Sequence, residues 1–253
     1  MIDLKFGDCL EVMKDIESGS IDAIMTDPPY GTTACKWDSV IDFELMWEHL
    51  HRIIKPNGAI VLFGSEPFSS ALRMSNIKNY KYDIIWDKVL HSNPLIAKKQ
   101  PLSAHENISL FYKKQPTYNP QMIGEIDNTL IRKGDKIHGT ETKGKTKHNI
   151  SKNKTGKRYP KKILTIANTK RGGLHPTQKP VALMEYLIKT YTNEGELVLD
   201  FAAGSFSTGV ACLNTNRQFI GIEKDEGYFT IGEKRMLEGI KYSSEQIKKI
   251  DKL

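Results

Sequence analysis

The chain has 253 residues, of which 39% are hydrophobic and 26% charged, with a net charge of +7 at pH 7. This length allows a core that needs no disulfide or metal support, and the composition excludes integral membrane and low-complexity proteins. Three widely spaced cysteines cannot form a disulfide framework or a zinc site, which indicates a reducing compartment and no bound metal. The first residues lack the basic start and apolar stretch of a signal peptide, so we expect a cytoplasmic protein that does not contact membranes.

Short apolar runs alternate with amphipathic stretches in the first 114 residues, a pattern typical of parallel strands covered by helices. A helix is predicted over Phe43 to Ile54, and the turn-forming sequence Lys55 to Gly58 is expected to end it. Strands are predicted at Leu4–Phe6, Asp22–Thr26, Ala59–Phe63, Tyr82–Trp86 and Ile108–Phe111. The order of these elements predicts an α/β fold.

The apolar pattern fades between Gln115 and Gly173, which we interpret as an insertion outside the core. Within it, residues Ile131 to Arg171 carry 14 Lys or Arg and 2 Asp or Glu, whereas the rest of the chain is mildly acidic. A cationic stretch of this density favours contact with a polyanion such as nucleic acid. The alternative is a solvated loop that binds nothing.

Helical and strand periodicity returns after the insertion. Helices are predicted at Pro180–Ile188 and Ser207–Leu213, and strands at Glu196–Asp200 and Gln218–Glu223. A polar, lysine-rich tail follows Met236. Two α/β blocks, at about 1–114 and 174–235, therefore flank the basic insertion.

The sequence Asp27-Pro28-Pro29-Tyr30 directly follows a predicted strand. Ligands of open α/β sheets bind at the carboxyl ends of strands, so this position favours a ligand site. The two prolines have no backbone donors, which leaves their carbonyls free as acceptors. A carboxylate and a carbonyl can then hold one amino group while the tyrosine ring stacks on the base that carries it. The alternative is a rigid turn with a capping aspartate and a packed tyrosine.

A second predicted strand ends at Asp200 and enters a turn of small residues before the next helix. Such a turn lets a ligand approach the backbone, and the first amides of the helix favour a negative group. A later strand ends at Glu223, where nucleotide-binding folds place the carboxylate that binds a ribose. This pattern alone fits a nicotinamide-dependent oxidoreductase equally well.

Taken together, these motifs resemble the beta class of DNA amino-methyltransferases, which use S-adenosylmethionine. The resemblance rests on the order of five features: Asp27–Tyr30, the basic insertion, His175–Pro180, Leu197–Ser205 and Phe219–Glu223. It implies a class I methyltransferase fold, a Rossmann-like, doubly wound and mostly parallel sheet with a circularly permuted motif order. It also implies a catalytic half at 1–114, a target-recognition insertion at 115–173, and a cofactor-binding half with a C-terminal tail at 174–253.

The resemblance implies catalytic roles for Asp27, Pro28, Pro29 and Tyr30. Asp27 and the carbonyl of Pro28 are expected to accept hydrogen bonds from the exocyclic amino group of a flipped base, on which Tyr30 stacks. Direct methyl transfer then needs no metal and no covalent intermediate. In the resembled family the aspartate form of this motif goes mostly with N6 of adenine and a serine form with N4 of cytosine. N6-adenine is therefore the main expectation, and N4-cytosine is the alternative.

The cofactor implied by the resemblance is S-adenosylmethionine, and the motifs assign residues to it. Glu223 is expected to hold the ribose, Asp8 the adenine edge, and Asp200 with the following turn the methionine portion. Three residues, from the motif after the insertion, are expected to close the pocket. The complete expected set is Asp8, His175, Thr177, Lys179, Asp200, Ala202, Ala203, Gly204, Ser205 and Glu223.

The partner implied by the resemblance is double-stranded DNA, bound through the insertion. Phosphate contacts are expected from its lysines and arginines, namely Arg132, Lys133, Lys143, Lys145, Lys147, Lys152, Lys154, Lys157 and Arg158. A homodimer and a cognate restriction nuclease are further expectations that the sequence leaves open.

The segment after Asp200 departs from the resembled family in two ways: Phe201-Ala202 replaces the usual Pro-Phe, and Phe206 stands where a glycine is usual. A phenylalanine facing the cofactor would obstruct it. We favour the alternative, in which the ring packs between helix and sheet. A DNA-binding protein of the same fold that has lost the cofactor is the competing hypothesis.

Overall fold

The computed structural model describes residues 1–31, 39–91, 94–125, 157–168 and 178–250. The chain forms two compact units, one from residues 1–119 and 162–253 and the other from residues 120–161. The described part of the smaller unit is a two-stranded antiparallel ribbon of β6 (Ile123–Glu125) and β7 (Lys157–Arg158).

The larger unit is built on an eight-stranded sheet of order β1-β10-β9-β2-β3-β5-β4-β8. The strands from β1 to β3 in this order are parallel, β5 is antiparallel to β3 and β4, and β8 is parallel to β4. In sheet order the strands span Ile2–Phe6, Gln218–Glu223, Leu197–Asp200, Ile21–Thr26, Ile54–Gly64, His105–Phe111, Tyr80–Asp87 and Ile163–Thr165.

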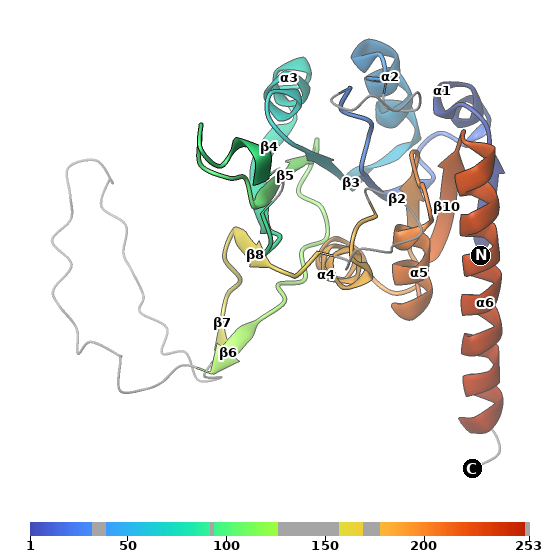
Figure 1. Cartoon of the computed structure of the whole chain (residues 1–253). Helices are drawn as coiled ribbons and strands as arrows, with labels where there is room; N and C mark the ends of the chain where they lie inside the picture. Colours follow the sequence, from blue (N-terminus) through green and yellow to red (C-terminus); the bar gives the residue numbers. More distant parts are fainter. Residues whose placement is uncertain (32–38, 92–93, 126–156, 169–177, 251–253) are drawn as a thin grey trace, which may run out of the picture. The chain divides into compact units, whose positions relative to one another are not determined.

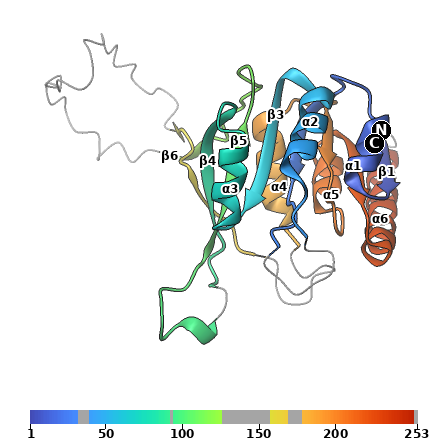
Figure 2. The same ribbon diagram turned by 90° about the horizontal axis from the view of Figure 1, so that it is seen from above.

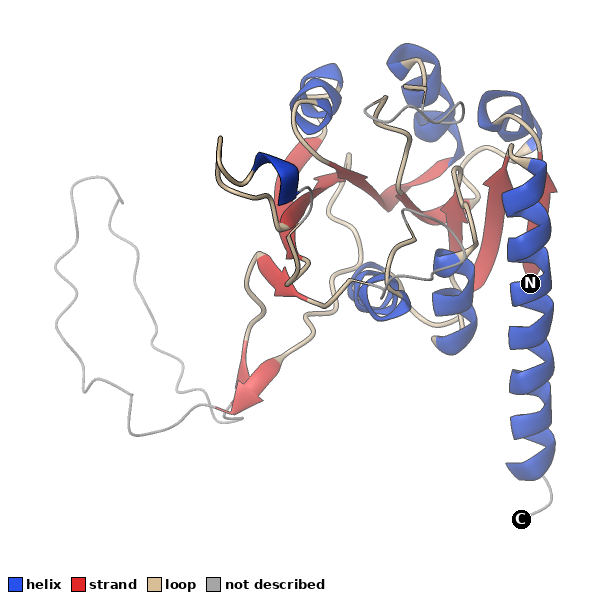
Figure 3. Cartoon of the chain, viewed as in Figure 1, coloured by secondary structure: helices blue, strands red, loops and turns tan. Residues whose placement is uncertain are grey.

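Helices cover both faces of this sheet. Figure 1 shows α1, α2 and α3 on one face and α4, α5 and α6 on the other, and Figure 3 shows the same layers coloured by secondary structure. Seen from above, α3 lies beside β5 (Figure 2). The helices α1 to α6 span Cys9–Val12, Phe43–Ile53, Phe68–Ser75, Val181–Tyr191, Ser207–Asn214 and Glu226–Ile250, and short 3-10 helices lie at Met13–Asp15 and Pro94–Ile96.

The core consists of two apolar clusters, one on each face of the sheet. Ala23 and Met25 of β2 pack with Leu187 of α4, whereas Ile24 between them belongs to the cluster that contains Leu50 of α2. Successive strand residues point to opposite faces, so a strand covered on both sides must be apolar throughout. This requirement explains the apolar run Ala23–Met25 in the middle of β2.

The two α/β blocks of the sequence meet where β2 pairs with β9, through Ala23 with Val198 and Ile24 with Leu199. From β2 the chain crosses through α2 to β3, and from β9 it crosses through α5 to β10 on the other side. The connections therefore diverge at the carboxyl ends of β2 and β9, which is where open α/β sheets bind ligands.

Helix α2 ends at Ile53, one residue before its predicted end, and the turn expected at Lys55–Gly58 lies inside β3. The residues form an irregularity in register, because Ile21 of β2 pairs with Ile54 while Ala23 pairs with Ala59. Gly58 is required there, since a Cβ would lie 2.6 Å from the Ile54 side chain and 2.8 Å from a backbone oxygen of β2.

The predicted strands and the helices at α2, α4 and α5 are confirmed within a few residues. The structure adds to the prediction at two places. The lysine-rich tail predicted after Met236 continues α6, and Met236 itself is buried in the core. The expected insertion at 115–173 is too long, because β8 at Ile163–Thr165 pairs with β4. The short helices α1 and α3 were not predicted. None of the described helices is both long and apolar enough to cross a membrane.

Candidate active site

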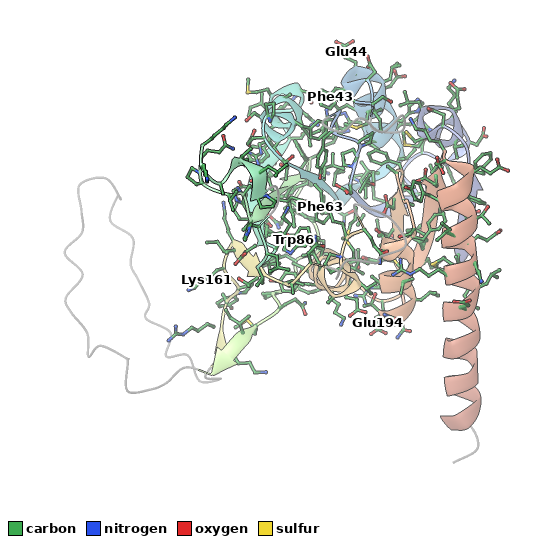
Figure 4. The ribbon with its side chains drawn as sticks, viewed as in Figure 1. Phe43, Glu44, Phe63, Trp86, Lys161 and Glu194 are labelled. Carbon is green, nitrogen blue, oxygen red and sulfur yellow. The ribbon has the colours of Figure 1, made fainter. Side chains whose placement is uncertain are left out.

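A cavity of about 820 Å³ opens at the carboxyl ends of the parallel strands. Its wall combines Asp27 after β2, Asp200 at the end of β9 and Glu223 at the end of β10. Phe63 and Trp86, labelled in the interior of the unit in Figure 4, form part of its apolar lining. The structure thus brings the two motif groups of the sequence together in one cavity.

The Asp27–Tyr30 segment leaves β2 directly into this cavity. The Tyr30 hydroxyl donates a hydrogen bond to Oδ1 of Asp27. Its ring lies 5.0 Å from the ring of Phe68, centroid to centroid, at an interplanar angle of 31°. An aromatic face and a carboxylate therefore lie next to each other, which suits a planar ring that carries an amino group.

Lys179 makes a contact that the sequence did not predict. The resemblance places Lys179 at the cofactor, but its ammonium donates to Oδ2 of Asp27, the residue expected to hold the base. The ammonium also lies 3.3 Å from Oε2 of Glu106 and 5.2 Å from the centroid of the Phe63 ring. Its side chain is 9% exposed, so the charge is nearly removed from solvent.

Glu106 and Lys88 complete this charged group and were not identified from the sequence. Oε1 of Glu106 accepts a hydrogen bond from the Lys88 ammonium at 3.1 Å. Glu106 lies in β5, and because β5 runs antiparallel to β3, its first residues lie at the carboxyl edge of the parallel strands. The charged pair His105-Glu106 before a predicted apolar strand was the available signal, but its meaning depends on the strand direction.

Burial and charge oppose each other in this group. Burial raises the pKa of Asp27, while the Lys179 ammonium acts to lower it. For Glu106 burial also acts to raise the pKa, but Lys179 and Lys88 outweigh it and the pKa is lowered. Burial disfavours the Lys179 ammonium, yet the two carboxylates prevail and raise its pKa. The ionisation of these three groups is therefore set by the balance between burial and the opposite charges beside them.

Asp200 lies at the other end of the cavity and is held by neutral donors. Its Oδ2 accepts from the Thr208 hydroxyl at 2.5 Å and its Oδ1 from the Ala202 amide at 3.3 Å. Burial raises the pKa of Asp200 to about 7. Among the described residues no Lys or Arg pairs with it, so the carboxylate can accept a cationic ligand group.

Glu223 fastens the turn after β9 to the end of β10. Its Oε2 accepts from the Gly204 amide at 2.7 Å and its Oε1 from the Asp225 amide at 2.8 Å. Each oxygen has a further lone pair for a hydroxyl donor. Asp8, which also lines the cavity, caps α1 by accepting from the Leu10 amide at 2.9 Å.

Phe206 points away from the cavity, as favoured from the sequence. It is fully buried, with its ring 6.2 Å from that of Phe219 and 5.9 Å from that of Phe229. Its φ of 55° is the left-handed conformation that a glycine would adopt without strain. The turn keeps its shape because Arg235 donates to the Ser205 carbonyl oxygen at 2.8 Å.

Several predicted site residues lie outside the described part of the chain. These are His175 and Thr177 of the expected cofactor set and, of the expected DNA contacts, Arg132, Lys133, Lys143, Lys145, Lys147, Lys152 and Lys154. Lys157 and Arg158 are described, and both are exposed on β7. Ala202, Ala203, Gly204 and Ser205 line the cavity together with Asp200.

Comparison with known proteins identifies one family. Residues 21–234 match the family described as DNA methylase. The chain is similar to the DNA adenine methyltransferase YhdJ of Escherichia coli (strain K12), with 31% identity over 97% of this chain and 86% of that protein. It is 28% identical to the Type II methyltransferase M.HpaI of Haemophilus parainfluenzae, over 90% of this chain and 71% of that protein. A crystal structure of an M1.HpyAVI–SAM complex superposes with a TM-score of 0.63 at 28% identity, over 93% of this chain and 99% of the other.

Proposed function

This chain belongs to the DNA methylase family, and we propose that it methylates the N6 amino group of an adenine flipped out of double-stranded DNA, with S-adenosylmethionine as donor. The observation that carries the proposal is the position of Asp27 and Tyr30 in the same cavity as Asp200 and Glu223. One cavity thus offers a place for an amino-bearing base beside a place for a nucleoside cofactor.

Asp27 and Tyr30 are proposed to bind the base. The adenine amino group donates to Asp27 and to the carbonyl of Pro28, which draws its nitrogen toward the tetrahedral geometry needed for attack. Tyr30 stacks on the ring, and this contact offsets part of the few kcal/mol that flipping costs. Because the Tyr30 hydroxyl bonds to Oδ1 of Asp27, the entering amino group replaces that hydroxyl. The restricted φ of Pro29 limits how far the Pro28 carbonyl can turn away from the Asp27 carboxylate.

The cofactor end of the cavity fits S-adenosylmethionine. The buried Asp200 carboxylate has only neutral donors among the described residues, and it can accept the cationic amino group of the methionine portion. Glu223 lies at the end of β10, where its free lone pairs can accept the ribose hydroxyls, and Asp8 lines the same cavity as the turn at Ala202–Ser205. When bound, the cofactor supplies an electrophilic methyl group on a sulfonium. With both bound, the residues named here would hold the amino nitrogen beside this methyl group and exclude water.

DNA contact is proposed for the smaller unit and the basic residues around it. Support comes from the charge of Ile131–Arg171 and from the exposed Lys157 and Arg158 of β7. A cognate restriction nuclease is proposed on the name of M.HpaI, a Type II methyltransferase. The homodimer and the cytoplasmic location stay predictions from the sequence.

The test incubates the purified protein with unmethylated bacterial genomic DNA and methyl-labelled S-adenosylmethionine, followed by nucleoside analysis. We expect label in N6-methyladenine for the wild type and for Asp3→Ala, a control on β1, and none for Asp27→Ala. Label in N4-methylcytosine alone would replace the proposal with the cytosine activity of the same family. Bound DNA without any transfer would favour the non-catalytic alternative.

A further inference from the structure

Four charged side chains form a chain of alternating sign beside the base end of the cavity. Asp27 contacts Lys179, Lys179 lies 3.3 Å from Oε2 of Glu106, and Oε1 of Glu106 lies 3.1 Å from the Lys88 ammonium. They come from four places in the fold: the end of β2, the segment before α4, the start of β5 and the end of β4. Their charges sum to zero, so none is uncompensated.

Burial increases the energetic effect of losing any contact in this group. The side chains of Lys179, Lys88 and Glu106 are 9%, 11% and 16% exposed, and that of Asp27 is 21% exposed. Ion pairs on the surface contribute little, but removing one partner of a buried pair leaves a charge without compensation. Lys179 is further confined by the Phe63 ring next to it. The ammonium is therefore held in one position relative to Asp27.

The two oxygens of Asp27 consequently have different environments. Oδ2 bonds to the ammonium of Lys179, which is itself held by Glu106. Oδ1 bonds to the hydroxyl of Tyr30, which is a neutral group. Both bonds have the carboxylate as acceptor, but only Lys179 brings a full opposite charge to it, so Oδ1 is the oxygen that exchanges its partner.

We propose that Lys179 and Glu106 are positioning residues for the transfer: they anchor Oδ2 of Asp27 and thereby direct Oδ1 at the amino group of the target base. This inference rests on the proposed function. Glu106 orients Asp27 only through Lys179, and Lys88 donates to the far oxygen of Glu106, which restrains the glutamate. Neither residue touches the reacting atoms.

The charges around Asp27 predict opposite effects of the two residues on pH dependence. Asp27 must be ionised to accept the amino group, so its protonation sets the acidic limb of kcat. Lys179 favours ionisation, whereas Glu106, a like charge, disfavours it. The other titratable groups that face the base end are Tyr30 after β2, Lys88 at the end of β4 and Asp200 at the end of β9. These three are unchanged in the variants below.

The experiment measures kcat, the KM for DNA, and the pH profile of kcat for Lys179→Gln, Glu106→Gln, Lys179→Arg and the wild type. We expect kcat to fall by roughly ten- to a hundredfold in the two glutamine variants, because misplacing a reacting group by about 1 Å has an effect of that size. The KM for DNA should change little. The acidic limb should move to higher pH in Lys179→Gln and to lower pH in Glu106→Gln. Lys179→Arg, which keeps the charge, should retain the wild-type limb.

Controls distinguish a loss of positioning from misfolding of a variant and from failure of the proposed function. Lys189→Gln, which removes an exposed lysine 3.9 Å from Glu185 on α4, should match the wild type. Binding of S-adenosylmethionine, measured by calorimetry, checks the fold of each variant. If Lys179→Gln fails to bind the cofactor, the test uses Glu106→Gln and Lys179→Arg instead.

Two results would overturn the positioning roles while leaving the wild-type activity intact. In one, the acidic limb of the kcat profile does not move in the variants; in the other, it moves in the same direction in Lys179→Gln and Glu106→Gln. A wild type that forms no N6-methyladenine overturns the proposed function, and this inference with it.

Discussion

The ring of Phe206 fits against Gly232, so closely that a Cβ on Gly232 would lie 2.0 Å from Cδ2 of that ring. Gly232 lies on α6, and Phe206 precedes α5. This contact allows a phenylalanine in the turn that lines the cavity without placing its ring in the cavity. The start of α6 therefore covers the Phe206 ring, since Phe229 also contacts it.

Gly232→Ala should destabilise the fold. The added methyl group has no room beside the fully buried ring, and overpacking of this kind costs about 1–3 kcal/mol. The free energy of unfolding is measured by denaturant titration. Gly239→Ala on the same helix is the matched control, since its nearest neighbour is the end of the Leu213 side chain at 3.2 Å. Equal effects of the two changes would contradict the fit described here.

Phe206→Gly restores the residue usual in the resembled family, yet it should destabilise this protein. Removing a buried aromatic ring costs about 3–5 kcal/mol, and relief of the left-handed φ returns about 1–2 kcal/mol. The Kd for S-adenosylmethionine should not improve, because the ring does not face the cavity. Unfolding and calorimetry measure the two quantities. Tighter binding in the variant would show that Phe206 obstructs the cofactor.

Binding of S-adenosylmethionine should strengthen as pH rises through 7. Burial raises the pKa of Asp200 to about 7, so at pH 6 the free protein holds a proton that a cationic ligand must displace. Between pH 6 and pH 8 the Kd should fall about tenfold. In Asp200→Asn the binding should be weak and nearly independent of pH. Calorimetry at these two pH values measures the Kd. If Asp200→Asn keeps the wild-type pH dependence, Asp200 is not the group that causes it.

The same carboxyl links pH to stability. Its folded pKa lies above the ordinary value of 3.8, so the folded chain binds the proton more tightly than the unfolded chain. This contribution is fully present below about pH 4 and is lost as pH rises through about 7. Its sign is therefore opposite to that of a salt-bridged aspartate.

Tyr30→Phe and Tyr30→Ala should differ strongly in activity. The phenylalanine keeps the stacking ring and loses only the hydroxyl that bonds to Asp27, which the base displaces in any case. We expect kcat/KM for DNA to stay within about threefold of the wild type. The alanine removes stacking worth about 1–3 kcal/mol, so kcat/KM should fall by roughly five- to a hundredfold. Equal loss in both variants would mean that the hydroxyl, and not the ring, carries the effect.

Replacing Lys157 and Arg158 together by alanine should weaken DNA binding and reduce its salt dependence. Each lysine or arginine that no longer neutralises a phosphate lowers the slope of log K against log salt by about 0.9, so the double change corresponds to about 1.8. The control is Lys5→Ala with Lys14→Ala, two lysines that pair with Asp3 and Glu11 outside the smaller unit. Binding titrations at several salt concentrations measure the slope. An unchanged slope would remove β7 from the proposed DNA surface.

Much of this protein follows from local sequence. The apolar run at Ile21–Thr26, the polar motif directly after it and the strand that ends at Glu223 are readable in the chain, because strand burial and strand ends depend on neighbouring residues. The order of the motifs was sufficient to predict the fold class and the cofactor. The position of Asp27 at a carboxyl strand end followed from the same pattern.

The tertiary structure decided the features that depend on distant segments. The sequence cannot show that Lys179 meets Asp27 and Glu106, because this requires the direction of β5, which is antiparallel to β3. Nor can it show where the Phe206 ring points, since that depends on a glycine of α6. Alternating polarity reports which face of an element is buried, but the partner of a buried charge or ring is set by segments far apart in the chain. The sequence alone therefore determined most strands, three of the helices and the family resemblance, and the packing of the elements decided which side chains act on one another.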